Sequence, residues 1–172
     1  MSGRDEAFSQ FALGQASALR RLAYTLVGDW HRADDLVQGT FERAFVNWRR
    51  VRSADEPAAY LRTILVRLAA SEGRRVWRRR EWNTADAPEP RPVAADIDQA
   101  SDRVDLARLL AGLTVKQRAI VVLRYIEDRP VHEVAAVLGI AEGTVKRQTH
   151  DALATLRALA TSTMPTREVP RG

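Results

Sequence analysis

The stretch GIAEGTVKRQTHDAL, from Gly139 to Leu153, decides how the second half of this chain folds. Val145, Thr149 and Leu153 recur at the spacing of one helical face, which predicts a helix over residues 142–159. A shorter apolar pattern precedes Gly139, and glycine readily adopts the left-handed conformation that ends many helices. A helix, a tight turn and a second helix form a helix-turn-helix. The first residues of its second helix meet base edges in the DNA major groove.

The rest of the chain also shows helical periodicity, with no alternating strand pattern. Apolar stripes follow residues 19–27, 33–48, 61–69 and 106–113. Pro57 suits the first turn of the third helix. Thr114 and Gln117 have the spacing of a capping box, which starts another helix. The sequence therefore predicts an all-α protein.

Charge and proline content change between the two helical halves. Five of the seven residues from Arg74 to Arg80 are arginine, whereas residues 85–102 hold five carboxylates, three prolines and one arginine. Proline and acid without apolar periodicity predict a flexible linker, because such a segment buries too little surface to fold. We expect a helical domain over residues 1–83, a linker over 84–103, a helix-turn-helix domain over 104–160 and a disordered tail over 161–172.

Composition narrows the class of protein. The chain has 172 residues, a net charge of +5 and no cysteine, which excludes disulfides and thiolate metal sites. A basic chain favours polyanions such as nucleic acid. No apolar run approaches the roughly 20 residues of a membrane span, and the polar N-terminus does not read as a signal peptide. We therefore expect a cytoplasmic protein without membrane insertion.

Enzyme readings find little support in the sequence. The three histidines, His31, His132 and His150, are not spaced with carboxylates as a metal-ligand set. His132 and Glu133 lack the second histidine of a zinc-binding helix, and neither a phosphate-binding glycine loop nor a serine elbow is present. We expect no catalytic residues, no metal, no cofactor and no small-molecule substrate.

Three motifs in order resemble a known family. They are ADDLVQ at residues 33–38, PAAYLRTILVRLAA at 57–70 and LGIAEGTVK at 138–146. Together with the acidic linker, they resemble bacterial RNA polymerase sigma factors of the extracytoplasmic-function type of the sigma-70 family, in particular SigE-like actinobacterial members. The resemblance implies a factor that binds core RNA polymerase and directs it to promoters through −10 and −35 elements. It also implies an anti-sigma factor as a candidate partner.

The resemblance implies a polymerase-docking face on the second predicted helix. In the family, this face contacts a coiled coil of the largest polymerase subunit, and here it comprises Asp35, Leu36, Gln38 and Phe41. Periodicity places Leu36 mainly in the core, so Asp35 and Gln38 are the better contact candidates. Gly39 stands where the family usually has glutamate, in what we expect to be an exposed helix position.

The resemblance places −10 recognition and DNA melting on the third helix and the segment after it. The candidate residues are Arg62, Arg67, Arg74, Arg75, Trp77, Arg78, Arg79 and Arg80. Arginines with interleaved tryptophans suit unpaired DNA, because each stacked base is worth about 1–3 kcal/mol. The alternative is a solvated run of charge. Arg67 also departs from the family, which often has asparagine there.

The −35 contacts implied by the family fall mainly on the last helix. The candidates are Arg124, Thr144, Lys146, Arg147, His150 and Asp151, with Arg124 and Thr144 assigned to phosphate. Asp151 stands where arginine is common in the family, and Ala141 replaces a serine cap.

The alternative function is a stand-alone helix-turn-helix regulator. It would need a ligand pocket or dimer interface in the first domain, and the sequence shows a signature of neither.

Overall fold

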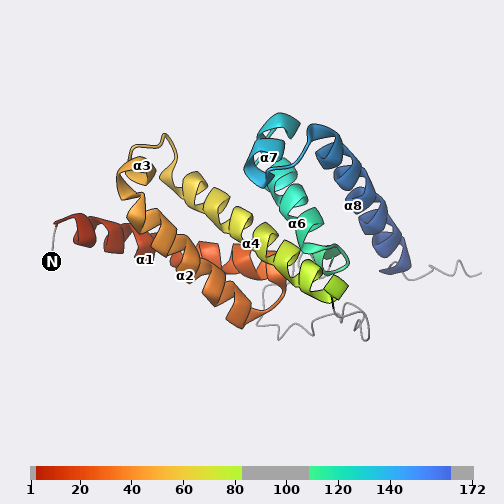
Figure 1. The fold of residues 1–172 in the computed structure, drawn as a ribbon, viewed down its shortest axis with the longest axis horizontal. Helices are drawn as coiled ribbons and strands as arrows, with labels where there is room; N and C mark the ends of the chain where they lie inside the picture. Colours follow the sequence, from red (N-terminus) through yellow and green to blue (C-terminus); the bar gives the residue numbers. More distant parts are fainter. Residues whose placement is uncertain (1–2, 83–108, 164–172) are drawn as a thin grey trace, which may run out of the picture.

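The computed structural model describes residues 3–82 and 109–163, and within these ranges every regular element is helical (Figure 1). The first region contains α1 (Gly3–Val27), α2 (Trp30–Val46), α3 (Trp48–Arg52) and α4 (Pro57–Trp82). The second region contains α6 (Val115–Val121), the π-helix η1 (Val122–Ile126), α7 (Val131–Leu138) and α8 (Glu142–Thr163). The linker predicted over residues 84–103 lies outside the described residues.

Local sequence accounts for several helix ends. Gly28, with φ of 71°, follows the last residue of α1, and Gly139, with φ of 64°, follows α7 in the same left-handed conformation. The Asp29 side chain accepts a hydrogen bond from the backbone of Arg32 and so caps α2. Both bonds of the predicted Thr114 capping box are present. The helix boundaries therefore follow from the cap and glycine rules.

Two boundary predictions are wrong. The stripe over residues 33–48 predicted one helix, but α2 ends at Val46 and Asn47 bonds back to the Arg43 carbonyl at 2.9 Å. Trp48 then starts α3 and is buried beside Phe8, at 5.3 Å between ring centroids. At the other end, residues 161–163 belong to α8 rather than to a disordered tail, because the sequence has neither glycine nor proline there to stop the helix.

The first region is a packed set of long helices. Fully buried leucines from α1, α2 and α4 meet at its centre: Leu19, Leu26, Leu36, Leu61 and Leu65. The Thr40 hydroxyl is buried with them and donates to the Leu36 carbonyl at 2.7 Å. Gly39 is half-buried rather than exposed, because α2 packs there on α4: a Cβ at Gly39 would lie 3.6 Å from Leu68.

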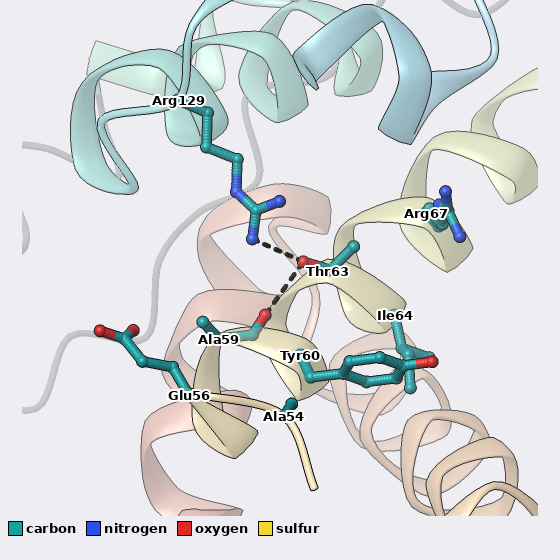
Figure 2. Close-up of a pocket in the computed structure, with 8 residues that line it drawn as sticks. All are labelled: Ala54, Glu56, Ala59, Tyr60, Thr63, Ile64, Arg67 and Arg129. Carbon is teal, nitrogen blue, oxygen red and sulfur yellow. Dashed lines mark hydrogen bonds between the residues drawn. The ribbon is translucent and has the colours of Figure 1, made fainter. Parts of the chain in front are cut away.

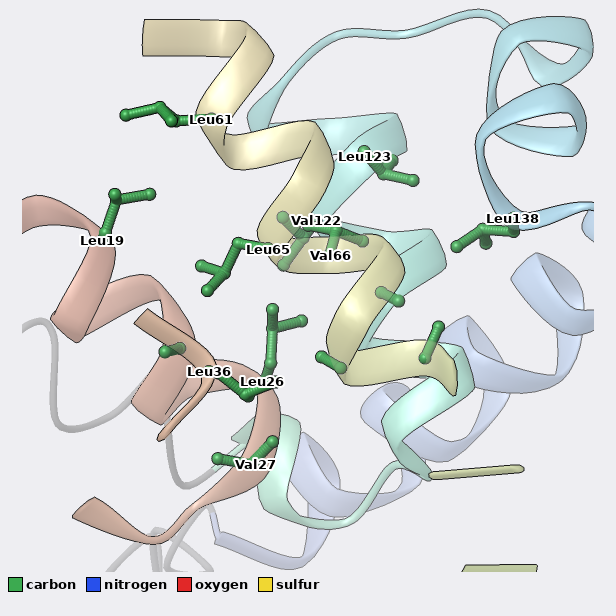
Figure 3. Packing of buried hydrophobic residues seen from close by; sticks show 14 of the residues in the cluster. Leu19, Leu26, Val27, Leu36, Leu61, Leu65, Val66, Val122, Leu123 and Leu138 are labelled. Carbon is green, nitrogen blue, oxygen red and sulfur yellow. The ribbon is translucent and has the colours of Figure 1, made fainter. Parts of the chain in front are cut away.

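The second region shares this core. Ile120, Val122 and Leu123 join Leu65 and Val66 of α4 in one hydrophobic cluster (Figure 3). A smaller cluster inside the second region contains Leu110, Leu113, Val121 and Ala152, with Leu156 packed against it. The second region therefore packs directly on α4 through α6 and η1.

Leu65 tests how much this core contributes to stability. Its side chain is fully buried, so Leu65→Ala should lower the free energy of unfolding by about 2–5 kcal/mol through lost transfer energy and a cavity. Leu13→Ala is the matched control, because Leu13 lies on α1 with 78% of its surface exposed. Urea unfolding followed by circular dichroism measures both. Equal losses in the two variants would contradict the assigned core.

Candidate polymerase and nucleic-acid interfaces

An open apolar groove lies between α1 and α2. Its volume is about 470 Å³, and it is lined by Phe8, Asp34, Val37, Gln38, Phe41, Glu42 and Phe45. The aromatic and aliphatic side chains form its floor, while two carboxylates and an amide stand among them. A groove with this lining suits a helical partner that brings apolar and basic side chains together.

Aromatic contacts hold the groove in shape. Phe8 meets Phe41 and Phe45 edge to face, with ring centroids 6.3 Å and 5.1 Å apart. The Arg4 guanidinium lies over the Phe45 ring and donates to the Phe45 carbonyl at 2.9 Å. These contacts tie the start of α1 to the end of α2, so the groove is already formed in the chain alone.

The polymerase-docking residues predicted from sequence occupy different environments. Asp35 and Gln38 are exposed, as predicted, and Phe41 is half-buried in the groove. Leu36 is only 1% exposed and belongs to the core, so its side chain is not available to a partner in this conformation. Sequence reasoning missed Phe8 and Phe45, which line the groove. Phe45 was counted in the apolar stripe of residues 33–48, and Phe8 precedes the stripe of residues 19–27, so neither was singled out as a contact residue.

Asp34 carries a fixed charge at the edge of the groove. Arg20 donates to both of its carboxylate oxygens, at 2.5 Å and 3.1 Å. This hydrogen-bonded pair lowers the pKa of Asp34 below its usual value. Arg20 in turn lies over the Trp30 ring, which stacks on Tyr24 with centroids 4.1 Å apart. The groove therefore keeps a carboxylate at its rim at neutral pH.

A second pocket, of about 430 Å³, lies where α4 meets the second region (Figure 2). Its lining residues are Ala54, Glu56, Ala59, Tyr60, Thr63, Ile64, Arg67 and Arg129. Arg129 reaches from the second region and donates to the Thr63 hydroxyl at 2.7 Å. The sequence did not single out Tyr60 or Thr63. Neither belongs to the apolar stripe of residues 61–69, and neither carries a charge that would mark it as a contact with DNA.

The candidate −10 arginines that the structure describes both contact the second region. Arg62 forms an ion pair with Glu127 at 2.6 Å, and the Glu127 side chain is only 9% exposed. The Arg67 side chain is exposed, and its Nε donates to the Val137 carbonyl at 2.8 Å. Residues 74–80 continue α4 as helix, and their side chains, including Arg74, Arg75, Trp77, Arg78, Arg79 and Arg80, lie outside the described part of the structure.

The start of α8 presents the predicted polar face to solvent. Lys146, Arg147, His150 and Asp151 are exposed, and Thr144 is half-buried. On the other side, Val145 and Ala152 are fully buried. The Ala141 carbonyl accepts from the backbone of Thr144 and Val145, but its side chain has no oxygen with which to cap the helix. The exposure pattern agrees with the amphipathic helix predicted from spacing.

Arg124, predicted to contact phosphate, lies apart from that face. Its side chain is half-buried, and it donates to the Arg129 carbonyl at 2.6 Å. In this conformation it braces the turn between η1 and α7.

Within residues 3–82 and 109–163, the structure contains no helix with the length and apolar character of a membrane span. No group of three potential metal-ligating side chains occurs within those same ranges.

Comparison with known proteins identifies the family. Residues 15–79 match the profile of sigma-70 region 2, and residues 109–158 match that of sigma-70, region 4. The chain is 36% identical over 150 residues to the RNA polymerase sigma-E factor of Streptomyces coelicolor, covering 87% of this chain and 84% of that protein. The chain belongs to the sigma-70 family of RNA polymerase sigma factors.

Further relatives confirm the extracytoplasmic-function type of this sigma factor. It is 34% identical over 145 residues to the ECF RNA polymerase sigma factor SigL of Mycobacterium tuberculosis, covering 83% of this chain and 82% of that one. Among solved structures, it resembles the sigma factor RpoE of Bartonella quintana in complex with the anti-sigma factor NepR. That likeness has a TM-score of 0.65 at 26% identity and covers 92% of this chain and 99% of the other.

Proposed function

We propose that this sigma factor binds core RNA polymerase through the α1–α2 groove and directs it to promoters by contacting the −10 element with α4 and the −35 element with α8. The observation that carries the proposal is the presence, in one chain, of the exposed polar face of α8 and of a separate formed groove in the first region. A stand-alone regulator would use the recognition helix and leave this groove without a role.

The groove fits a coiled-coil partner. Its apolar lining, with Val37 and Phe41, would bury the partner's apolar side chains, and the carboxylates of Asp35 and Glu42 would face basic ones. Complementary charge at such a rim mainly increases the association rate and fixes the orientation of the partner. The groove is already formed, so the docking step needs little rearrangement of the first region.

The DNA-binding roles follow from side-chain chemistry. Arg147 can hold a guanine through two hydrogen bonds, whereas Lys146 suits a phosphate, which positions the protein without specifying sequence. His150 and Asp151 lie on the same exposed stretch of α8. On α4, Arg62 and Arg67 supply positive charge and Tyr60 an aromatic ring beside a pocket, a combination that suits an unstacked base and its phosphates.

We further propose that the protein acts without chemistry of its own and works in the cytoplasm, where polymerase and chromosome are found. A structural relative was solved with an anti-sigma factor. An anti-sigma factor is therefore a candidate partner here as well.

Run-off transcription tests the proposal as a whole. Purified protein and the core RNA polymerase of its host bacterium are incubated with a library of genomic fragments, and transcripts are sequenced from their 5′ ends. We expect new start sites that share two upstream elements and require the added protein. A complete absence of such starts, with a core enzyme that responds to another sigma factor, would refute the function.

The docking surface predicts the behaviour of a double variant. Asp35→Ala/Gln38→Ala should weaken binding to core polymerase by roughly tenfold, or about 1.4 kcal/mol, because both side chains are exposed and belong to the proposed interface. The helical signal in circular dichroism should not change. Asp55→Ala, an exposed carboxylate in the loop between α3 and α4, is the control and should bind as the wild type does. Unchanged affinity of the double variant would remove these residues from the interface.

The recognition helix predicts two different effects of neighbouring substitutions. Arg147→Ala should reduce discrimination at one or two −35 positions by about 1–3 kcal/mol, because a paired guanine contact is lost. Lys146→Ala should weaken all sequences about equally. Selection of randomised −35 elements by polymerase holoenzyme containing each variant measures both effects. Sequence preferences of Arg147→Ala identical to those of the wild type would mean that Arg147 does not read a base.

A further inference from the structure

The exposed start of α8 carries one carboxylate among cationic and neutral polar groups. Lys146, Arg147, His150 and Asp151 are all exposed, and Asp151 is the only acid of the four. A DNA duplex presents one phosphate charge about every 1.7 Å along its axis, so a carboxylate on a DNA-facing surface is repelled by the backbone. A surface that only bound phosphate would bind more tightly without this group. Asp151 therefore needs a role other than phosphate binding.

Helix geometry places Asp151 beside Arg147 on one face of α8. Each residue of an α-helix advances by about 100° around the axis and about 1.5 Å along it. Arg147 and Asp151, four positions apart, are therefore separated by about 40° around the helix and about 6 Å along it. Val145 and Ala152, which are fully buried, lie on the other side. Successive base pairs are about 3.4 Å apart, so the two exposed side chains can meet pairs one or two steps apart.

Packing fixes which face of α8 points outward. Ala152 belongs to the buried cluster that contains Leu110 and Leu113. The C-terminal part of α8 approaches Gly112 so closely that a Cβ there would overlap the Leu159 side chain. Rotation of α8 would break these contacts. In Figure 1, α8 lies at the outer edge of the second region, on the side of α6 away from α4. Its exposed face is therefore fixed, and it is open to a duplex.

The Asp151 carboxylate does not pair with its neighbour on the helix. The spacing from Arg147 would allow an ion pair along α8, but no ion pair joins the two side chains in the part of the chain that the structure describes, residues 3–82 and 109–163. The Thr155 hydroxyl donates to the Asp151 backbone carbonyl at 3.1 Å and so does not occupy the carboxylate. Both Arg147 and Asp151 can therefore bind an outside partner.

A carboxylate distinguishes the four bases by their major-groove edges. At neutral pH it only accepts hydrogen bonds. Cytosine presents the N4 amino donor with no acceptor beside it, whereas adenine presents its N6 amino group next to the N7 acceptor. Guanine presents two acceptors, and thymine presents an acceptor and a methyl group. Asp151 should therefore attract cytosine, tolerate adenine poorly and reject guanine and thymine.

We propose that Asp151 is a specificity-determining residue of −35 recognition, whose carboxylate accepts a hydrogen bond from the N4 amino group of a cytosine in the major groove. The inference rests on the proposed function, which places α8 on the −35 element. Arg147, one helical turn earlier, holds a guanine one or two base pairs away. On sequences without the cytosine, the unpaired carboxylate faces acceptors and phosphates. Asp151 thus lowers general affinity and raises discrimination.

Selection of −35 variants by polymerase holoenzyme tests the assignment. The −35 element found by run-off transcription is randomised, and the wild type is compared with Asp151→Ala and Asp151→Asn. Wild-type holoenzyme should prefer cytosine at one position by roughly tenfold. Asp151→Ala should reduce that preference to about twofold or less, and Asp151→Asn should move it toward adenine, because an amide pairs with both N6 and N7. A preference that neither substitution changes overturns the proposal.

Preferences at the other positions separate a base contact from a structural role. Both variants should keep the wild-type preferences elsewhere in the element and the wild-type helical signal in circular dichroism, because Asp151 is exposed. Glu133→Gln removes the same charge from an exposed position on α7 and is the control. It should keep the cytosine preference. Loss of that preference in the control, or a uniform loss over all positions in Asp151→Ala, overturns the assignment to Asp151.

Promoter affinity should change in opposite directions on matched and mismatched DNA. Holoenzyme binding is measured for a promoter with the preferred cytosine and for one with thymine in its place. Asp151→Ala should bind the cytosine promoter less tightly than the wild type does. It should bind the thymine promoter at least ~3-fold more tightly, because the repulsion is removed. A loss of affinity for both promoters overturns the proposal, since it would report damage to α8 rather than loss of a base contact.

A modified base locates the contact at the amino group. The base 2-pyrimidinone differs from cytosine by the absence of the N4 amino group. Its substitution at the preferred position should weaken binding of the wild-type holoenzyme by roughly tenfold more than binding of the Asp151→Ala holoenzyme, because only the wild type loses a partner of the carboxylate. Equal losses in the two proteins overturn the hydrogen bond to N4.

The proposed function and this inference fail in different ways. If wild-type holoenzyme starts transcription without any shared −35 element, the proposed function is refuted, and the assignment of Asp151 with it. If the element is found but its base preferences do not depend on Asp151, the proposed function stands and the assignment of Asp151 is overturned.

Discussion

The helix α4 is buried from two sides, and the rest of the structure depends on that constraint. One face of α4 packs on α1 and α2, and another receives α6 and η1, so that Leu65, Val66 and Ile120 belong to one cluster. Burial of apolar surface stabilises a fold roughly in proportion to the area removed from water. The second region also holds a small cluster of its own. Its contact with α4 therefore adds buried apolar surface to that of its own helices.

Arginine gives this contact its geometry. Hydrophobic packing alone would allow the second region to slide on α4, because apolar contacts have little directional preference. The guanidinium groups of Arg67 and Arg118 instead reach carbonyls at defined helix ends, and Arg62 meets Glu127. Such bonds are also exchangeable, since phosphate oxygens can replace carbonyl and carboxylate oxygens as acceptors. The arginines proposed to contact DNA are thus also suited to hold a protein surface.

The three candidate surfaces differ in which contacts form them. The α1–α2 groove is formed by contacts within the first region, with Phe8 packed on Phe41 and Asp34 bound to Arg20. The exposed face of α8 is set by the periodicity of that helix and by the burial of Val145 on its opposite face. The α4 face, by contrast, is occupied by residues from elsewhere in the chain. Whether a partner can reach the α4 face depends on the arrangement of the two regions rather than on the local structure of α4.

Local sequence determined the helical class, several helix ends and the polarity of α8. Gly28, Gly139 and the Thr114 capping box act through neighbouring backbone atoms, and periodicity alone separates Val145 from Arg147 on opposite faces of one helix. The family motifs likewise occur as contiguous stretches. These features were predictable because the interactions behind them span only a few residues.

Only the tertiary structure decided which of these residues are free to act. No local pattern connects Arg62 with Glu127 or Arg118 with Leu26, since each pair is separated by dozens of residues. Leu36 and Gln38 both lie in the stretch predicted to dock on polymerase, yet packing of α2 on α4 buries one and leaves the other exposed. The helix break at Asn47 and the left-handed Asp128 also follow from packing around them. Long-range contacts set these features because burial depends on which surfaces meet, and short stretches of sequence do not contain that information.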